Sequence, residues 1–104
     1  AGGAGAEAPA ERDRAERGKA LLAQYQCGAC HTIPGVVGSS TRVGPPLEDV
    51  GSRQLIAGTL PNSHENMMRW LMHTQQVKPG TAMPQLGVAP QDARDMAGYL
   101  ATLR

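Results

Sequence analysis

The sequence predicts an all-α domain whose long loops must be held in place by something other than its own side chains. Three observations support this expectation. Several stretches favour helix, and no stretch alternates polar and apolar residues as a half-buried strand does. The connections between them are long and rich in Gly and Pro. At 104 residues the chain forms one domain, yet it has no Phe, one Trp and two Tyr with which to fill a core.

The first helix is expected from Pro9 or Ala10 to about Tyr25. Proline suits the first turn of a helix, and acidic residues follow it near the positive end of the helix dipole. Gly18 lies inside this stretch, where glycine costs about 1 kcal/mol relative to alanine, so we expect another backbone to approach it closely. Residues 1–9 are of low complexity and are expected to form a flexible N-terminal segment or a linker.

Residues 32–52 are predicted to be loop, because Gly and Pro recur throughout them. Within this loop, Gly44-Pro45-Pro46-Leu47 is expected to be a rigid extended turn. A short helix is expected next, over residues 52–57, with Ser52 as its N-cap and Gly58 at its end.

Two longer helices are expected in the second half of the chain. Ser63 is the predicted N-cap of the first of them, over about residues 64–74. Its apolar face would consist of Met67, Trp70, Leu71 and Thr74. After a loop over residues 75–89, Pro90 begins the last helix, which is expected to end near Leu103. The inner face of that helix would consist of Ala93, Met96, Ala97 and Leu100.

The motif with the most specific chemistry is Cys27-Gly28-Ala29-Cys30-His31. It reads Cys-x-x-Cys-His, the attachment signature of a c-type haem. Two thiols at this spacing can each form a thioether bond with one vinyl group of the porphyrin, and the imidazole of His31 would then bind iron. Three other interpretations stay open: a Cys27–Cys30 disulfide, a zinc site that lacks its further ligands, and two thiols in a small core.

A covalent haem would also supply the core that the composition lacks. A porphyrin with several hundred Å² of buried apolar surface contributes on the order of 10 kcal/mol. We therefore expect one covalently attached haem c, and we expect the chain without haem to fold poorly.

The second iron ligand is expected to be Met83. The other Met and His side chains are expected to be core or surface groups of predicted helices: Met67, Met68, Met72, Met96, His64 and His73. Met83 instead lies in a loop between Pro79 and Pro84, where a rigid backbone can direct its thioether to iron. A His/Met pair raises the reduction potential relative to two His ligands. On the other side, the Pro45 carbonyl is expected to accept a hydrogen bond from the non-ligating nitrogen of His31.

The net charge is close to zero, with ten Lys+Arg against nine Asp+Glu. This balance argues against a nucleic-acid-binding surface and against the lysine-rich face of a carrier steered over long range. No apolar run approaches the length of a transmembrane helix, and no intact signal peptide is recognisable. We therefore expect a mature protein or a piece of a longer one.

Together these residues resemble a class I cytochrome c, over about residues 16–104. The motifs that carry the resemblance are Cys-x-x-Cys-His at 27–31, Gly44-Pro45-x-Leu47, Met83-Pro84 and Tyr99-Leu100. The resemblance implies a class I cytochrome c fold, with about four helices and long loops wrapped around one covalent haem, here over residues 10–104. In that family the first and last helices cross at a glycine and an aromatic, which Gly18 and Tyr99 match. The usual aromatic of the first helix is replaced by Leu22.

A narrower resemblance is to the cytochrome c domain fused to subunit II of caa-type cytochrome c oxidases. It rests on His31-Thr32-Ile33, Gly51-Ser52-Arg53, Ala57-Gly58-Thr59-Leu60-Pro61-Asn62, Trp70, and Lys78-Pro79-Gly80 with Met83-Pro84. It implies electron transfer to the dicopper centre of that subunit, with residues 1–9 as the linker from the copper domain. A tethered donor needs no long-range steering. It also implies that Arg53 and Trp70 contact haem propionates, the alternatives being a solvated charge and core packing.

The sequence thus predicts a monohaem electron-transfer domain, not an enzyme by itself, that donates electrons to the dicopper centre of a terminal oxidase. One alternative is a freestanding periplasmic cytochrome c that shuttles between a quinol-oxidising complex and an oxidase. The other is a haem enzyme or gas sensor with an open sixth position. The electron-transfer interpretations place the domain in the periplasm or on the outer face of the cytoplasmic membrane, either free or tethered to a membrane subunit. They imply no nucleic-acid partner and no membrane insertion of this segment.

Overall fold

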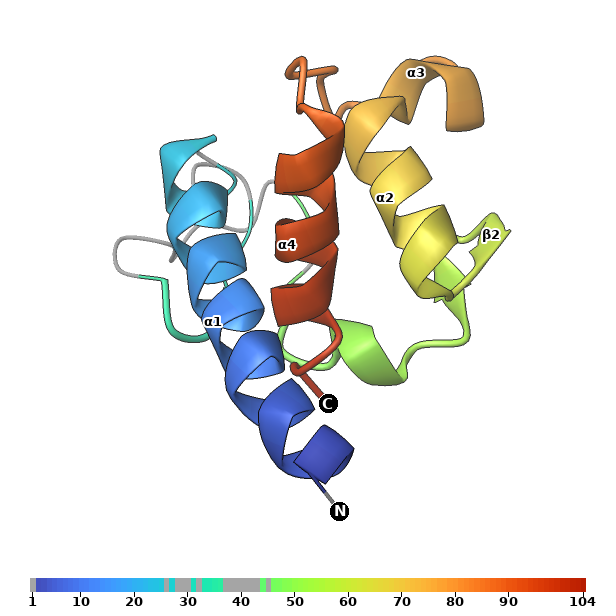
Figure 1. Cartoon of the computed structure of the whole chain (residues 1–104). Helices are drawn as coiled ribbons and strands as arrows, with labels where there is room; N and C mark the ends of the chain where they lie inside the picture. Colours follow the sequence, from blue (N-terminus) through green and yellow to red (C-terminus); the bar gives the residue numbers. More distant parts are fainter. Residues whose placement is uncertain (1, 26, 28–30, 32, 37–43, 45) are drawn as a thin grey trace.

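The computed structural model describes residues 2–25, 27, 31, 33–36, 44 and 46–104. Its elements in chain order are helix α1 (Gly2–Gln24), the 3-10 turn η2 (Val50–Ser52), strands β1 (Leu55–Ile56) and β2 (Leu60–Pro61), and helices α2 (His64–Met72), α3 (Thr74–Val77) and α4 (Pro90–Leu100). Helix α4 lies between α1 and α2 and packs against both (Figure 1). The expected helical fold is confirmed, with one small antiparallel sheet added to it.

The crossing of α1 and α4 depends on Gly18, as the sequence predicted. A Cβ atom at Gly18 would collide with the carbonyl oxygen of Asp95 and lie 2.5 Å from its carbonyl carbon. Only a residue without a side chain allows the two backbones to approach this closely. Polar contacts between the two helices flank the crossing, among them an ion pair of Arg14 with Asp95 at 4.0 Å. The Arg17 Nε donates to Asp95 Oδ2 at 3.4 Å, and the Tyr25 hydroxyl donates to Asp92 Oδ2 at 2.7 Å.

Helix α1 begins at Gly2, earlier than the expected start at Pro9 or Ala10. Three alanines lie between Gly2 and Pro9, and alanine has the highest helix propensity. Proline inside a helix removes one backbone hydrogen bond, so Pro9 makes this part of α1 less stable than an uninterrupted helix. The use of residues 1–9 as a linker stays a prediction.

The prediction of a short helix over residues 52–57 is wrong. The chain instead forms η2 and then the hairpin of β1 and β2. Ala57 and Gly58 have φ values of 53° and 68°, a left-handed conformation that cannot belong to a right-handed helix. The Thr59 N–H donates to the Ile56 carbonyl at 2.9 Å and closes the turn.

The side chain of Asn62 explains why this segment folds as a hairpin. Its Nδ2 donates to the carbonyl oxygens of Val50 at 3.0 Å and Arg53 at 2.8 Å. Its backbone N–H donates to the Gln54 carbonyl at 2.9 Å. These bonds occupy one carbonyl within η2 and two just after it, so one residue after the hairpin fixes the segment that precedes it.

Helices α2 and α4 follow the sequence expectations closely. The Ser63 Oγ accepts a hydrogen bond from the Asn66 N–H at 3.1 Å, which confirms the N-cap. Helix α2 ends because His73 has a non-helical backbone, and α3 then adds one further turn. In α4, Pro90 occupies the first turn, and the predicted inner face is buried: Ala93, Met96, Ala97 and Leu100. The helix ends at Leu100, slightly earlier than expected.

Candidate haem-binding site

Cys27 and His31 lie just beyond the end of α1. Cys27 is buried and belongs to the hydrophobic core cluster together with residues of α2 and α4. The backbone N–H of His31 donates to the Cys27 carbonyl oxygen at 3.0 Å, which places the two residues one helical turn apart. His31 is half-buried. The other predicted residues of this side, Cys30 and Pro45, lie outside the described residues.

Gly44 lies directly against the imidazole ring of His31. A Cβ atom at Gly44 would collide with Cε1 of the ring and lie 2.7 Å from Nδ1 and 2.9 Å from Nε2. A side chain at this position would therefore displace the ring or the loop. Gly44, the residue before the predicted acceptor Pro45, is thus in contact with the imidazole that Pro45 is expected to orient.

Met83 packs against the same core cluster that contains Cys27. It is half-buried, and hydrogen bonds fix its backbone on both sides. The Met83 carbonyl accepts from Gln75 Nε2 at 3.2 Å, and the Met83 N–H donates to Thr81 Oγ1 at 3.4 Å. The structure therefore brings the start of the haem-attachment motif and the predicted second ligand to one core, although 56 positions separate Cys27 from Met83 (83 − 27 = 56).

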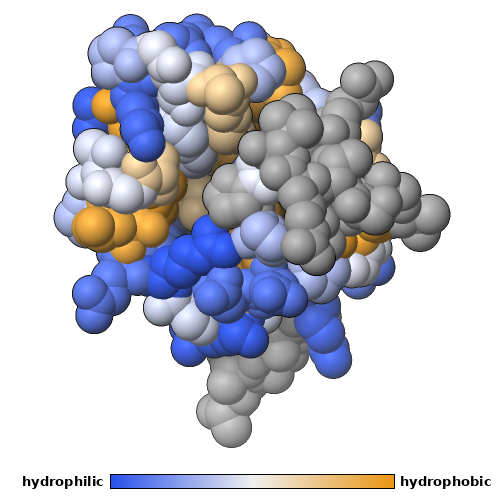
Figure 2. All heavy atoms as spheres, turned by 180° about the vertical axis from the view of Figure 1, so that it is seen from behind, coloured by the Kyte–Doolittle hydropathy of each residue, from blue (hydrophilic) through white to orange (hydrophobic). Residues whose placement is uncertain are grey.

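The core has an apolar surface that a porphyrin could cover. Partly buried hydrophobic side chains pack around the buried cluster: Leu21, Tyr25, Val36, Leu47, Ala57, Leu60, Met68, Met72, Val77, Met83, Tyr99 and Leu103. The face seen in Figure 2 is hollowed near its centre, and hydrophobic residues lie in and beside the hollow. Covering such side chains with a flat apolar ring contributes favourably in proportion to the area removed from water. The apolar surroundings and the thiol, imidazole and thioether groups fit a haem.

One buried polar atom supports the same conclusion. The Thr74 side chain is 0% exposed, and its hydroxyl has no hydrogen-bond partner among the described residues. A buried hydroxyl without a partner costs about 1–3 kcal/mol. The core of the described protein therefore contains a donor that a group from elsewhere could satisfy.

Arg53 and Trp70, the predicted propionate contacts, are held in fixed positions. The Arg53 guanidinium forms a salt bridge with Asp49, with Nη2 and Nε at 2.7 and 3.0 Å from Oδ1, and Nη2 also donates to the Pro46 carbonyl. The remaining nitrogen, Nη1, has no partner in the described part of the chain. Trp70 lies on α2, 9% exposed in the core. Arg53 is thus held by its neighbours Asp49 and Pro46, and Trp70 is held by core packing.

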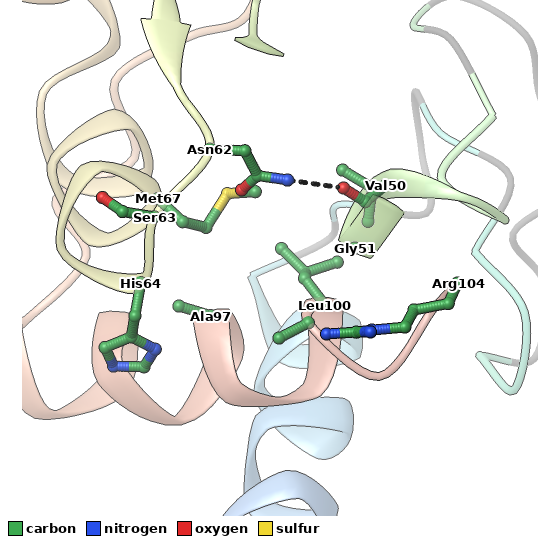
Figure 3. A pocket seen from close by; sticks show the side chains of 10 residues that line it. Val50, Gly51, Asn62, Ser63, His64, Met67, Ala97, Leu100 and Arg104 are labelled. Atoms are coloured by element: carbon green, nitrogen blue, oxygen red, sulfur yellow. Dashed lines mark hydrogen bonds between the residues drawn. The ribbon is translucent and has the colours of Figure 1, made fainter. Parts of the chain in front are cut away.

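A separate hollow of about 160 Å³ lies where η2, α2 and α4 meet (Figure 3). Asn62 and Met67 border it on one side, and Leu100 and Arg104 on another. None of Cys27, His31 and Met83 lines it, and its volume is below the range of about 300–1,000 Å³ typical of ligand pockets. This hollow is therefore not the haem site. His64 lies at it, on an exposed position at the start of α2.

The sequence reasoning missed several polar residues that shape the site. Asp49 holds Arg53, Asn62 fixes the carbonyls beside η2, and Gln75 holds the backbone of Met83. Asn62 and Gln75 bind backbone groups, which no helical or strand pattern of side chains indicates. Asp49 and Arg53 are four positions apart, but no α-helix covers them, so this spacing carried no helical signal. Gly44 was recognised as part of a rigid turn, but its contact with the His31 ring depends on how the loop returns to the motif.

The chain is similar to known proteins of one family. The family model of cytochrome c matches residues 15–104. The chain is also 31% identical over 91 residues to cytochrome c oxidase subunit 2 of Alkalihalophilus pseudofirmus, an alignment that covers 86% of this chain and 26% of that protein. It is 35% identical over 71 residues to the subunit 2 of Bacillus sp. (strain PS3), covering 66% of this chain and 20% of that protein. For Bacillus subtilis (strain 168) the identity is 32% over 76 residues, covering 71% and 21%.

The chain spans between about a fifth and a quarter of the length of these relatives. The family match is much more complete, because it runs from within α1 to the last residue and includes the whole crossing of α1 with α4. The resemblances found in the sequence, the class I fold and the haem c cofactor are thereby confirmed. The match covers most of the chain, including the Cys-x-x-Cys-His motif that follows α1. The chain therefore belongs to the cytochrome c family and is a haem-bearing electron-transfer domain.

Proposed function

We propose that His31 and Met83 bind the haem iron and that the domain donates electrons to the dicopper centre of an oxidase subunit II. One observation carries the ligand assignment. Met83 lies outside the helices, half-buried against the cluster that contains Cys27. The remaining methionines belong to helices: Met67, Met68 and Met72 to α2, and Met96 to α4. Met67 and Met96 are, in addition, buried core residues.

Each residue of the site then has a distinct task. The bound haem supplies the one-electron couple of its iron. Cys27 and Cys30 hold the haem covalently, and Gly44 and Pro45 fix the orientation of His31, with the Pro45 carbonyl as the hydrogen-bond acceptor of the ring. Because a soft thioether favours ferrous iron, the Met83 ligand raises the reduction potential.

The propionates would be held by the side chains of Arg53 and Trp70. Asp49 and Pro46 bind the Nε–Nη2 edge of the Arg53 guanidinium, which leaves Nη1 for an anionic oxygen. The indole N–H of Trp70 makes no hydrogen bond within the described part of the chain, and it can donate only. A propionate would satisfy both groups.

The proposed partner rests on the relatives and on charge. The three relatives described above carry the name cytochrome c oxidase subunit 2. Nearly balanced charges suit a donor that is tethered to its acceptor, because tethering replaces electrostatic steering. We place the domain in the periplasm or on the outer face of the cytoplasmic membrane. No described helix combines the length and apolar character needed to cross a membrane.

The ligand assignment is tested by visible spectra of the oxidised and reduced haem-loaded domain. Wild type should show a weak far-red sulfur-to-iron band when oxidised, and Met83→Ala should abolish it. Met68→Ala is the matched control, because Met68 is also half-buried beside the core but lies on α2. If the band is absent from wild type, or survives in Met83→Ala, Met83 is not the ligand. Carbon monoxide binding by reduced wild type would then favour an open sixth position.

The partner is tested by mixing the reduced domain with a purified dicopper domain of an oxidase subunit II. Rapid electron transfer to the copper centre is expected when the two domains are fused through residues 1–9, and slower, concentration-dependent transfer when they are separate. Equal rates in the fused and separate forms would contradict a tethered donor.

A further inference from the structure

One side chain of α3 binds the loop that carries Met83 at three points. The Gln75 Nε2 donates to the carbonyl oxygens of Thr81 at 2.9 Å and Met83 at 3.2 Å. The Gly80 N–H donates to the Gln75 Oε1 at 3.2 Å. A primary amide has two N–H donors and one carbonyl acceptor, so Gln75 can make all three bonds at the same time.

The rest of the loop makes few other hydrogen bonds with the described residues. The Thr81 N–H donates to the Lys78 carbonyl at 3.1 Å, and the Met83 N–H makes a long contact with Thr81 Oγ1 at 3.4 Å. Both are local, and neither ties the loop to a helix interior. Residues 84–88 make no backbone–backbone hydrogen bond with the described part of the chain. Gln75 therefore provides the main polar attachment of residues 80–83 to the helical scaffold.

The position of Gln75 is itself well fixed. It follows Thr74, which is fully buried, and it lies on the single turn of α3 that continues from α2. In Figure 1, α3 and the segment that leads into α4 lie at the same end of the molecule. The buried neighbour anchors the turn, while the exposed Gln75 side chain extends over the loop.

We propose that Gln75 is a positioning residue that keeps Met83 on the iron. This inference rests on the proposed ligation by Met83. By fixing the carbonyl of Met83 itself and two neighbouring backbone groups, Gln75 limits the conformations in which the thioether points away from the core. Because Gln75 is exposed, water can replace its bonds. Loss of the Gln75 amide should therefore raise the population of the open loop, in which the Met83 thioether has left the iron, without unfolding the core.

The open population can be measured with external imidazole, added to the oxidised haem-loaded domain. Imidazole can bind iron only when Met83 has left, so its apparent Kd equals the intrinsic Kd divided by the open fraction. Gln75→Glu keeps the acceptor oxygen and the size of the side chain but loses both donors. We expect the apparent Kd to fall about tenfold, since two hydrogen bonds of ordinary strength are lost. Gln75→Leu should act in the same direction without added charge.

Gln76→Glu is the matched control. Gln76 is the next residue of α3, is exposed, and has no side-chain hydrogen bond to the described residues. The Gln76→Glu substitution introduces the same charge in the same turn, and the apparent Kd of imidazole for this variant should stay within about twofold of wild type. Urea midpoints of the variants should agree with that of wild type, which separates an effect on the loop from general destabilisation.

The outcomes separate this inference from the ligand assignment. A tenfold change in both Gln75 variants, absent from Gln76→Glu, supports the positioning role. If wild type shows the far-red band but the Gln75 variants bind imidazole like Gln76→Glu, the positioning role is wrong and ligation by Met83 stands. If wild type has no far-red band, Met83 is not the ligand, and the positioning role is rejected with it.

Discussion

The crossing of α1 with α4 and the loop that carries Met83 are held by different kinds of contact. At the crossing, Gly18 meets the backbone of Asp95 with no space for a side chain, and the Asp95 side chain is buried beside Arg17. In the loop, Met83 is half-buried, and the exposed Gln75 supplies the main polar attachment. Steric fit between backbones allows one arrangement, whereas exposed hydrogen bonds compete with water.

This difference divides the haem site into two parts. Cys27 lies just beyond the end of α1, and the backbone N–H of His31 donates a hydrogen bond to the Cys27 carbonyl. The attachment motif therefore belongs to the region of the crossing. Met83 belongs to the region with fewer fixed contacts, and such regions open at lower free energy than the core. The comparison teaches that, in this domain, the attachment motif follows directly from the helical scaffold, whereas the proposed thioether ligand lies in the region with fewer fixed contacts of the two.

The largest effect is expected from removing the haem, which tests whether the crossing is stable by itself. In the double variant Cys27→Ala, Cys30→Ala we expect circular dichroism to show a loss of most native helicity. The haem contributes on the order of 10 kcal/mol, comparable with the whole stability of a small domain. The wild-type chain produced without haem is the control, because it keeps both thiols. Native-like helicity in either form would show that the crossing needs no cofactor.

A smaller but still large effect is expected at the crossing itself. Gly18→Ala places a Cβ atom on the Asp95 backbone, and it should lower the free energy of unfolding by about 3 kcal/mol. Gly98→Ala is the control on α4, since among the described residues its Cβ would come within 4 Å of Arg14 Cγ alone, at 3.9 Å. That change should be neutral or stabilise the helix by up to about 1 kcal/mol. Urea unfolding of the haem-loaded domain measures both, and similar values for the two variants would contradict the steric account.

The smallest effect is expected at Tyr25, which joins the end of α1 to the start of α4. The hydrogen bond to Asp92, burial and the nearby negative charge raise the pKa of Tyr25, while a hydrogen bond with the Ala89 backbone lowers it in part. The folded state therefore binds this proton more tightly than the unfolded state, whose tyrosine pKa is about 10. The resulting stabilisation is complete below pH 10 and is lost as the pH rises through the higher folded pKa.

Tyr25→Phe should therefore lower the urea midpoint slightly at pH 7, and the difference from wild type should shrink as the pH rises beyond 10. Urea midpoints of both proteins between pH 7 and pH 11 give this comparison. A difference that stays constant over the range would mean that the proton on Tyr25 contributes nothing to the contact.

Much of the helical framework could be predicted because its signals are local. The Ser63 cap and the buried face of α4 follow from the spacing of residues within one helix, and the cost of glycine inside a helix indicates the close approach at Gly18. The segment at 52–57 could not be predicted in this way. Its residues permit a short helix, but the hydrogen bonds of Asn62, made after the chain has turned back, favour the hairpin.

The sequence by itself determined the chemistry: Cys-x-x-Cys-His at 27–31 indicates a covalent haem, and a composition poor in aromatics is consistent with a cofactor in the core. Only the tertiary structure decided how the supporting groups are placed. Three examples are the contact of Gly44 with His31, the salt bridge of Asp49 with Arg53 and the three hydrogen bonds of Gln75. The sequence around these residues does not show which groups they contact. Burial patterns and covalent motifs depend on spacing along the chain, whereas polar side chains bind whichever backbone groups the fold brings within reach.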